Sequence, residues 1–293
     1  MITVFTPTYN RAYILPKLYE SLCHQTCKDF EWLIVDDGST DETEEVVNNM
    51  IFKTKLNIRY LKKENGGLNS AYNFAVENTE NEIFFRVDSD DSIKENAIQL
   101  IYDKWILVKN NEKLSGLVFL SVFNDGKVVG RHPFTKDVVS NFFDYRYKYR
   151  AVGDRAEVVK TSVLKNYPFP LLKNEKFIPE GLMWNRIAKE YDAIYINEPI
   201  YIRDYLEDSI TSKVVQTLKK NCKGATLYYS ELLKCKQPFL FFVKHSLLYW
   251  RYAFYKRISL KEKIKESGFS AFFIGFIPAF FILAIDKLKG RTI

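Results

Sequence analysis

Short apolar segments alternate with segments of helical periodicity along the first part of the chain. Four apolar runs have the length of buried strands, at residues 2–6, 32–35, 58–61 and 83–87. Between the first two runs, Leu15, Leu18 and Leu22 recur at helical spacing. Strands separated by helices of this length pair in parallel through right-handed crossovers. The pattern therefore predicts an α/β domain with a mostly parallel central sheet.

The pattern becomes mixed from residue 92 to about residue 212. Apolar spacing predicts helices and short strands there, without any repeat or low-complexity linker. The predicted helices are 98–108, 158–164 and 181–189, and the predicted strands are 117–122, 128–129, 194–196 and 200–203. We therefore predict one domain over residues 1–212 and a separate helical region over residues 213–293.

The C-terminal region differs from the rest of the chain in charge and in hydrophobicity. Residues 213–293 carry 16 Lys and Arg against 4 Asp and Glu, whereas residues 1–212 have a net charge of −5. Within it, residues 239–258 mix aromatic with basic residues, and residues 269–285 hold no charged residue. A basic segment of this kind indicates an anionic partner, either a lipid surface or a nucleic acid.

The uncharged run of 17 residues is at the lower length limit of a membrane-spanning helix, and Gly275 and Pro278 interrupt it. We therefore predict a re-entrant or interfacial membrane hairpin, with a buried pair of amphipathic helices as the alternative. Four cysteines without a C-x-x-C pair favour a reducing compartment. Met1 runs directly into a strand pattern without a signal peptide, so we expect the cytoplasmic face of a membrane.

Polar clusters follow three of the predicted strands, at Pro7–Asn10, Asp36–Ser39 and Asp88–Asp91. Ligands of open α/β sheets bind at the carboxyl ends of the strands, so these clusters are expected to share one crevice. Clustered carboxylates are costly to hold together without a cation, and their oxygen atoms suit Mg²⁺ or Mn²⁺. Asp88–Asp91 is therefore a candidate metal site, with a helix-capping turn as the alternative.

Several classes of protein do not fit these clusters. The chain lacks the glycine-rich loops G-x-G-x-x-G and G-x-x-x-x-G-K-[ST], which argues against a nicotinamide dinucleotide enzyme and a P-loop NTPase. A nucleotidyltransferase would need a glycine-rich basic loop after the first strand, where this chain has Pro7–Asn10. A non-enzymatic membrane- or nucleic-acid-binding protein would explain the basic region and leave the acidic strand ends unexplained.

The motifs at the strand ends resemble those of family 2 glycosyltransferases of the GT-A fold. The resemblance rests on VFTPTYNR at residues 4–11, FEWLIVDDGSTD at 30–41, NGG at 65–67 and DSDD at 88–91. It covers residues 1–92 and continues more loosely to about residue 212. It implies a metal-dependent enzyme that moves a sugar from a nucleoside-diphosphate sugar, with UDP favoured, to a hydroxyl group and inverts the anomeric configuration.

The resemblance also assigns roles to individual residues of the donor site. Pro7 and Tyr9 match positions that pack around the nucleotide, and Asp37 matches the carboxylate that reads uracil. Asp88 and Asp90 match the positions that meet the diphosphate. The expected ligands of Mg²⁺ or Mn²⁺ are Asp90 and Asp91.

A second motif supplies the expected catalytic base. Residues 179–186, PEGLMWNR, resemble the segment in which a carboxylate at a helix start takes the proton of the acceptor hydroxyl. The usual pattern is Glu-Asp, and here Gly181 replaces the Asp, which leaves Glu180 as the base. Asp154 and Arg155 match the acceptor side. The resemblance and the C-terminal region together lead us to expect a lipid-linked glycan as the acceptor, in the assembly of a surface polysaccharide.

Overall fold

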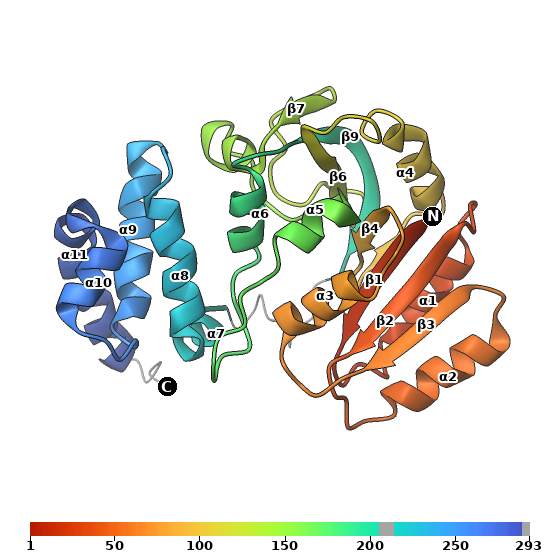
Figure 1. Cartoon of the computed structure of the whole chain (residues 1–293), viewed down its shortest axis with the longest axis horizontal. Helices are drawn as coiled ribbons and strands as arrows, with labels where there is room; N and C mark the ends of the chain where they lie inside the picture. The colour runs from red at the N-terminus through yellow and green to blue at the C-terminus, as the bar shows by residue number, and fades with distance from the viewer. Residues whose placement is uncertain (205–213, 289–293) are drawn as a thin grey trace. The chain divides into compact units, whose positions relative to one another are not determined.

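The computed structural model describes residues 1–204 and 214–288, and these residues form two compact units (Figure 1). The first unit holds Met1–Pro168 and the described residues 186–204. The second unit holds Phe169–Asn185 and the described C-terminal residues from Val214. The predicted boundary at residue 212 lies outside the described residues, and the segment Phe169–Asn185 groups with the C-terminal helices.

The first four strands and three helices alternate as the apolar pattern predicts. Strands β1 (Ile2–Thr8), β2 (Phe30–Asp36), β3 (Asn57–Lys62) and β4 (Ile83–Arg86) are parallel, in the order β3-β2-β1-β4. The helices between them are α1 (Leu15–Cys23), α2 (Thr43–Lys53) and α3 (Leu68–Glu77). This parallel half of the sheet brings the carboxyl ends of β1, β2 and β4 to one edge.

The other half makes the sheet mixed, in the order β4-β8-β6-β9-β5. Strand β8 is antiparallel to β4 and β6, β6 and β9 are parallel, and β5 and β7 are antiparallel to β9. These strands are β5 (Ser92–Ile93), β6 (Leu114–Phe123), β7 (Val138–Ser140), β8 (Arg155–Lys160) and β9 (Asp192–Arg203). The helical elements of this half are α4 (Ala97–Trp105), η1 (Asp144–Lys148, a π-helix) and α5 (Thr161–Asn166).

Three predictions for this half are wrong. The helix predicted over 158–164 is the end of strand β8 followed by helix α5. A short apolar run is compatible with both helical and strand periodicity. Its position in the sheet, between β4 and β6, makes the first part of this segment a strand. The two strands predicted at 194–196 and 200–203 are one strand, β9, whose register against β6 shifts before Pro199. Val128 pairs with Val122 by a single bridge instead of forming a strand.

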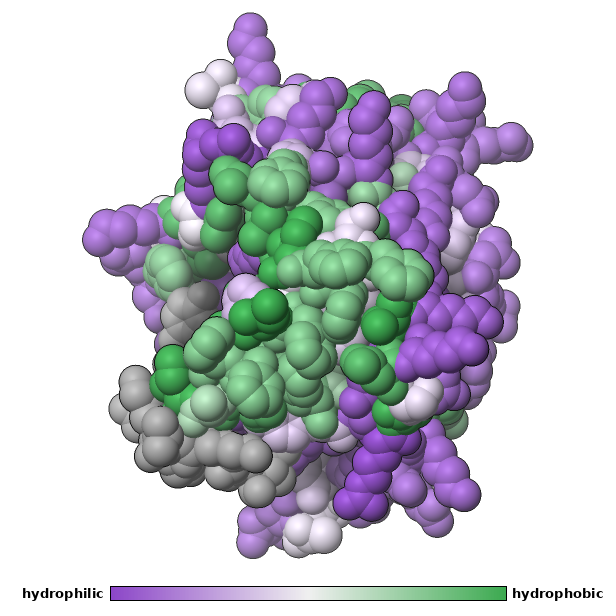
Figure 2. All heavy atoms as spheres, turned by 90° about the vertical axis from the view of Figure 1, so that its left-hand side faces the viewer, coloured by the Kyte–Doolittle hydropathy of each residue, from purple (hydrophilic) through white to green (hydrophobic). Residues whose placement is uncertain are grey.

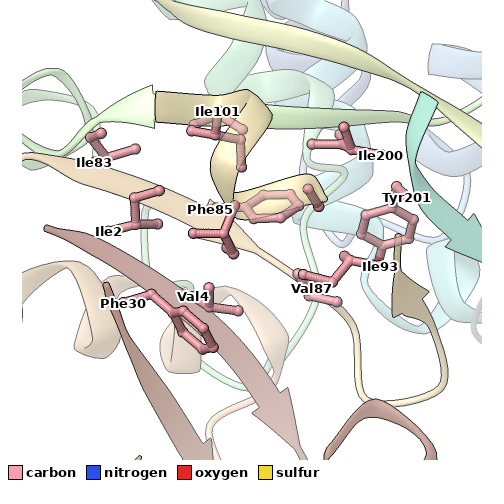
Figure 3. Close-up of a cluster of buried hydrophobic side chains, with 14 of the residues drawn as sticks. Ile2, Val4, Phe30, Ile83, Phe85, Val87, Ile93, Ile101, Ile200 and Tyr201 are labelled. Carbon is pink, nitrogen blue, oxygen red and sulfur yellow. The ribbon is translucent and has the colours of Figure 1, made fainter. Parts of the chain in front are cut away.

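Alternation along the strands divides the core into two layers. Ile2 and Val4 of β1 pack with α1 and α4 on one face, together with Phe85 of β4 (Figure 3). Phe5 points to the opposite face, where its ring meets Tyr72 of α3 edge-on at 5.6 Å between ring centroids. The layers bury both faces of β1 and β4, so the sheet edge that carries the polar clusters is fixed by close packing.

The second unit consists of helices. They are α7 (Val214–Lys220), α8 (Cys222–Leu233), α9 (Phe239–Ala253), α10 (Leu260–Ser267) and α11 (Phe269–Leu288), and α6 (Gly181–Ile187) begins in this unit. The Glu175 carboxylate accepts hydrogen bonds from the backbone N–H groups of Lys223 and Gly224, both at 2.8 Å. These bonds cap α8 and explain why Phe169–Asn185 groups with the C-terminal helices.

Helix α11 buries one side and exposes the other. Ala271, Gly275 and Ala279 are buried at four-residue spacing, and α11 packs on α9. A Cβ atom at Gly275 would lie 2.5 Å from the backbone of Ser246, so only glycine permits this approach. The opposite side exposes a stripe of apolar residues, Phe269, Phe273, Ile277, Phe281 and Ile285. Figure 2 shows a broad apolar patch on this end of the helical unit, bordered by hydrophilic residues.

The uncharged run of residues 269–285 therefore lies within one helix, α11, which has a wide exposed apolar side. Within residues 1–204 and 214–288, no single helix is long and apolar enough to cross a membrane. Leu260–Ser267 and Phe269–Ile285 pass that test only as a pair, across a bend of 117°.

Candidate active site

The loops after β1 and β2 are joined into one structure at the sheet edge. Thr8 pairs with Asp36, and the Asp37 N–H donates to the Thr8 carbonyl at 2.9 Å. Beyond the strands, the Asn10 N–H donates to Ser39 Oγ and the Thr40 N–H to Asn10 Oδ1, both at 2.8 Å. Asn10 has a φ of 53°, a left-handed conformation that asparagine tolerates better than most residues. The two predicted polar clusters thus form one rim.

Two predicted nucleotide-packing residues lie at this rim. Pro7 is half-buried within β1, and Tyr9 just beyond the strand is 48% exposed. Between them, the Thr8 side chain is buried, and its Oγ1 has no hydrogen-bond partner among the described residues. The rim therefore presents an exposed aromatic ring next to a buried hydroxyl group that a ligand could satisfy.

The Asp37 side chain holds the loop after β3. It is buried, and its Oδ1 accepts from the Gly66 N–H at 2.9 Å and from Lys63 Nζ at 2.8 Å. Its Oδ2 accepts from the Gly67 N–H at 2.7 Å. A carboxylate offers about four acceptor positions, so three bonds leave room for one more donor. Asp37 thus ties the Asn65-Gly66-Gly67 motif to the rim.

The three aspartates after β4 have different environments. Asp88 accepts from Arg86 Nε at 2.7 Å, and the Arg86 and Arg203 charges lower the pKa of Asp88 against the opposing effect of burial. Asp90 is half-buried, and burial together with the Asp88 charge raises the pKa of Asp90. Asp91 is fully buried, and burial raises its pKa to about 7.

Asp91 is bound inside the protein through both oxygens. Its Oδ2 accepts from the Tyr201 hydroxyl at 2.7 Å, and its Oδ1 accepts from the Asp204 N–H at 2.9 Å. The same Tyr201 oxygen accepts from the Asp88 N–H at 3.0 Å. Asp91 therefore attaches the loop after β4 to the end of β9. This arrangement leaves Asp90 the more accessible of the two predicted metal ligands.

The predicted acceptor-side pair separates into one accessible and one enclosed residue. The Asp154 side chain is 48% exposed and lies 3.4 Å from Arg203. Arg155 is buried, and all five of its N–H groups are hydrogen-bonded within the protein. The acceptors are the Tyr145 hydroxyl and the carbonyls of Val129, Arg131, Val152 and Asp154. With no N–H group left over, Arg155 cannot donate to an acceptor sugar in this conformation.

Arg155 instead stabilises a crossing of two backbone segments, which approach closely at Gly130 and Gly153. Gly130 and Gly153 have φ angles of 71° and 94°, in the left-handed region. A Cβ atom at Gly153 would lie 2.3 Å from the Val129 carbonyl oxygen. The guanidinium satisfies the carbonyls around this crossing, and the crossing places Asp154 at the sheet edge.

We expect Arg155→Lys to lower the free energy of unfolding of the full chain by about 3 kcal/mol or more, because several buried carbonyls lose their donors. Thermal unfolding followed by circular dichroism measures the effect. Arg59→Lys is the control, because Arg59 is half-exposed beside Glu31 and its exchange should cost less than about 1 kcal/mol. Equal melting temperatures for the two variants would contradict the conclusion that the hydrogen bonds of Arg155 hold the two backbone segments together.

The predicted base, Glu180, belongs to the second unit and lies at the start of α6. Its carbonyl accepts from the Met183 N–H at 3.0 Å, in the first turn of the helix. A Cβ atom at Gly181 would lie 2.9 Å from the Tyr228 hydroxyl and 3.0 Å from its ring. A side chain at position 181 would therefore require the Tyr228 ring to shift.

The carboxylates can be tested against the needs of a divalent cation. In the described part of the chain, no three His, Cys, Asp or Glu side chains group as a metal site. Magnesium and manganese ions that bind substrate phosphates need only one or two protein carboxylates, because phosphates and water fill the other positions. Asp88 and the more accessible Asp90 fit that requirement, so the donor set suits a cation shared with a diphosphate.

Solved structures share the architecture of the chain. TarS of S. aureus in complex with UDP-GlcNAc matches with a TM-score of 0.64 at 19% identity, covering 94% of this chain and 83% of that one. A mannosyltransferase, PcManGT of Pyrobaculum calidifontis, in complex with GDP-Man and Mn²⁺, matches with a TM-score of 0.57 at 17% identity, over 99% and 80%. The similarity identifies a GT-A-type α/β fold.

Sequence comparison then gives the family. The model of "Glycosyl transferase family 2" matches residues 3–157, and the chain belongs to that family. A relative from Campylobacter jejuni, the GalNAc(5)-diNAcBac-PP-undecaprenol beta-1,3-glucosyltransferase, is 29% identical over 241 residues, which is 80% of this chain and 73% of that protein. Of seven other curated relatives, the matched part of the chain spans between 11% and 49%.

Sequence reasoning missed the residues that organise the acidic cluster from a distance. Tyr201 and Arg203 lie at the end of β9, more than a hundred positions after Asp88, and the sequence pattern identifies them only as part of a strand. Lys63 was likewise not singled out, although it pairs with Asp37 at 2.8 Å. The one available signal was the position of these polar residues at strand ends, where ligands of α/β sheets bind.

Proposed function

We propose that the protein is an inverting glycosyltransferase that moves a sugar from a nucleoside-diphosphate sugar to a hydroxyl group of a glycan. The observation that carries the proposal is the sheet edge of a family 2 domain, where the buried Asp37 lies at one loop and Asp88 and Asp90 at the next. A base-binding carboxylate at one loop and diphosphate-facing carboxylates at the next suit a nucleoside diphosphate.

The donor is a UDP-sugar in this proposal. Asp37 has an acceptor position left for the N–H of a pyrimidine ring, and the exposed Tyr9 ring offers a surface on which the base packs. The buried Thr8 hydroxyl could bond to a polar atom of the nucleoside. The similar structure of TarS with UDP-GlcNAc supports a uridine donor.

Asp90, with Asp88, would hold Mg²⁺ or Mn²⁺ in this site. Such an ion supplies positive charge that stabilises the diphosphate as it leaves the sugar. Asp91 supports the loop from within, through its bonds to Tyr201 and the Asp204 N–H. The complex of the similar mannosyltransferase with GDP-Man and Mn²⁺ supports the use of a divalent cation.

Glu180 is the proposed general base. A sugar hydroxyl is a weak nucleophile, and a carboxylate that takes its proton during attack accelerates the reaction by about 10²–10⁴-fold. The oxygen of that hydroxyl attacks the anomeric carbon on the face opposite the diphosphate, and the C–O bond to the diphosphate breaks. One displacement of this kind inverts the anomeric configuration.

The proposed acceptor is a lipid-linked glycan, and the proposed location is the cytoplasmic face of a membrane. The relative from Campylobacter jejuni, named for an undecaprenol-linked glycan, supports such an acceptor. The helical unit supports the location through the exposed apolar stripe of α11, which holds no charged residue from 269 to 285. Residues 214–288 also carry 13 Lys and Arg against 4 Asp and Glu, which favours anionic headgroups.

We expect the double variant Phe273→Glu/Ile277→Glu to lose most binding to vesicles that contain anionic lipid, because both side chains lie on the exposed stripe, at 74% and 62% exposure. Co-sedimentation of the full chain measures the binding. Phe52→Glu is the matched control, since Phe52 of α2 is 92% exposed outside the helical unit. Equal sedimentation of all three proteins would rule out this surface, and a stable dimer broken by the variant would assign it to a second copy.

The decisive test of the proposed function is a panel of nucleotide sugars, incubated with the protein, Mn²⁺ and glycan acceptors and scored by released nucleotide. Release of UDP from one UDP-sugar, dependent on the acceptor, is the expected result. Pyrophosphate released from a nucleoside triphosphate would instead identify a nucleotidyltransferase. No turnover and no binding of any nucleotide sugar would contradict the proposal.

A further inference from the structure

Arg203, the last residue of β9, lies among three carboxylates of the candidate site. Its guanidinium is 3.6 Å from Asp88, 3.4 Å from Asp91 and 3.4 Å from Asp154. Asp88 and Asp91 come from the loop after β4, whereas Asp154 directly precedes β8. One cation thus contacts acidic residues from two separate parts of the chain.

The contacts of Arg203 are ion pairs without hydrogen bonds. Arg86 binds Asp88 at 2.6 and 2.7 Å, which is the range of a charge-assisted hydrogen bond. The 3.4–3.6 Å distances of Arg203 are longer than that range. Its Nε is also buried without a hydrogen-bond partner among the described residues. Arg155, with five bonded N–H groups, shows how this protein holds a guanidinium that only supports the fold.

The position of Arg203 has opposite effects on the two expected ligands, the divalent cation and the diphosphate. A positive charge this close to Asp88 and Asp91 repels a second cation by the same Coulomb interaction that attracts the carboxylates. A loosely bound guanidinium also attracts phosphate oxygens, with which it forms bidentate bonds. A diphosphate at the sheet edge would therefore draw Arg203 from the carboxylates and free them for a divalent cation.

We propose that Arg203 is the internal counter-ion of the acidic cluster and makes the binding of a divalent cation depend on the nucleoside diphosphate. Without nucleotide, Arg203 neutralises the carboxylates and keeps the cation affinity low. With nucleotide, phosphate oxygens share the guanidinium, and the cation binds between the phosphates and the carboxylates. Arg203 is a positioning residue in this proposal, which rests on the proposed function for the identity of the nucleotide.

The test measures Mn²⁺ binding to the full chain without nucleotide, by the electron paramagnetic resonance signal of free Mn²⁺. We expect Arg203→Gln to bind Mn²⁺ about tenfold more tightly than the wild-type protein, because a repelling charge next to the carboxylates is gone. Arg203→Met is the second neutral variant, in which an apolar side chain replaces the guanidinium that lies 5.4 Å from the centre of the Tyr201 ring. Arg203→Lys keeps the charge and should bind Mn²⁺ as weakly as the wild type.

Addition of UDP supplies the second measurement. UDP should raise the Mn²⁺ affinity of the wild-type protein strongly and that of the neutral variants little, so the dependence on nucleotide is lost. Arg59→Gln, which removes a cation of β3 that pairs with Glu31 of β2, is the control and should leave both measurements unchanged. Thermal unfolding shows which variants are folded.

Two results would overturn the role of Arg203: neutral, folded variants that bind Mn²⁺ no more tightly than the wild type, or a Lys variant that binds it as tightly as the Gln variant. The Mn²⁺ titration without nucleotide does not depend on any sugar-donor substrate. A protein that fails to bind UDP would therefore contradict the proposed function, while the Mn²⁺ titration would still decide the role of Arg203.

Discussion

Glu180→Gln should reduce turnover by about two orders of magnitude or more while donor affinity stays within a few-fold. The amide has nearly the shape of the carboxylate but cannot take a proton from the acceptor hydroxyl. Steady-state kinetics with a saturating donor measure the turnover, and calorimetry with UDP measures donor affinity. The thermal midpoint should be unchanged, because position 180 keeps its backbone bond to the Met183 N–H.

Glu175→Gln is the matched control for this variant. Glu175 lies five positions earlier, and its carboxylate caps α8 through the N–H groups of Lys223 and Gly224. Its exchange should lower the thermal midpoint and leave turnover of the folded protein nearly unchanged. Near-normal turnover of Glu180→Gln would assign the proton acceptor elsewhere, and Asp154, 48% exposed beside Arg203, would be the next residue to test.

Asp90→Asn should abolish the increase in UDP affinity that Mn²⁺ provides and leave the fold intact. Asp90 is half-buried at the sheet edge, so the amide is accommodated there, but a neutral side chain is a poor ligand for a hard cation. Calorimetry with UDP, in the presence of Mn²⁺ and in the presence of a chelator, separates the metal-dependent part of the UDP affinity from the metal-independent part. Turnover should fall with the metal-dependent affinity.

Asp91→Asn should behave differently, although the two residues are adjacent. Its buried carboxylate accepts from the Tyr201 hydroxyl and the Asp204 N–H, and an amide can satisfy at most part of that pattern. A loss of about 1–3 kcal/mol in unfolding free energy is expected. If Asp91→Asn lost the Mn²⁺ effect at unchanged stability while Asp90→Asn retained it, the metal ligand would be Asp91, as the sequence also allows.

The local pattern of the sequence was sufficient for the parallel half of the fold and for the candidate donor site. Strands β1, β2 and β4 are largely buried and appear as mostly apolar runs, which local periodicity detects. The polar clusters follow because parallel strands end at one edge, so Asp37 and Asp88 come to the same edge of one sheet. The motifs around them are specific enough to indicate the family.

Only the tertiary structure decided which polar side chains remain available to a ligand. Asp90 and Asp91 are neighbours in a single acidic motif, yet Asp91 is enclosed because Tyr201 and Arg203 arrive from the end of β9. Arg155 follows Asp154 directly, but the crossing at Gly130 and Gly153 uses all of its N–H groups. Such contacts join residues far apart in the sequence, and no local pattern reports them.

The same division holds for β8 and for the C-terminal helices. Residues 155–160 are a strand because β4 and β6 leave a slot for one, whereas their local spacing also fits a helix. The sequence established that residues 269–285 are uncharged and apolar. The packing of Ala271, Gly275 and Ala279 decided which side of α11 is buried, and thereby which side is exposed. Composition fixes how much apolar surface a segment has, but close packing between helices selects the side that is covered.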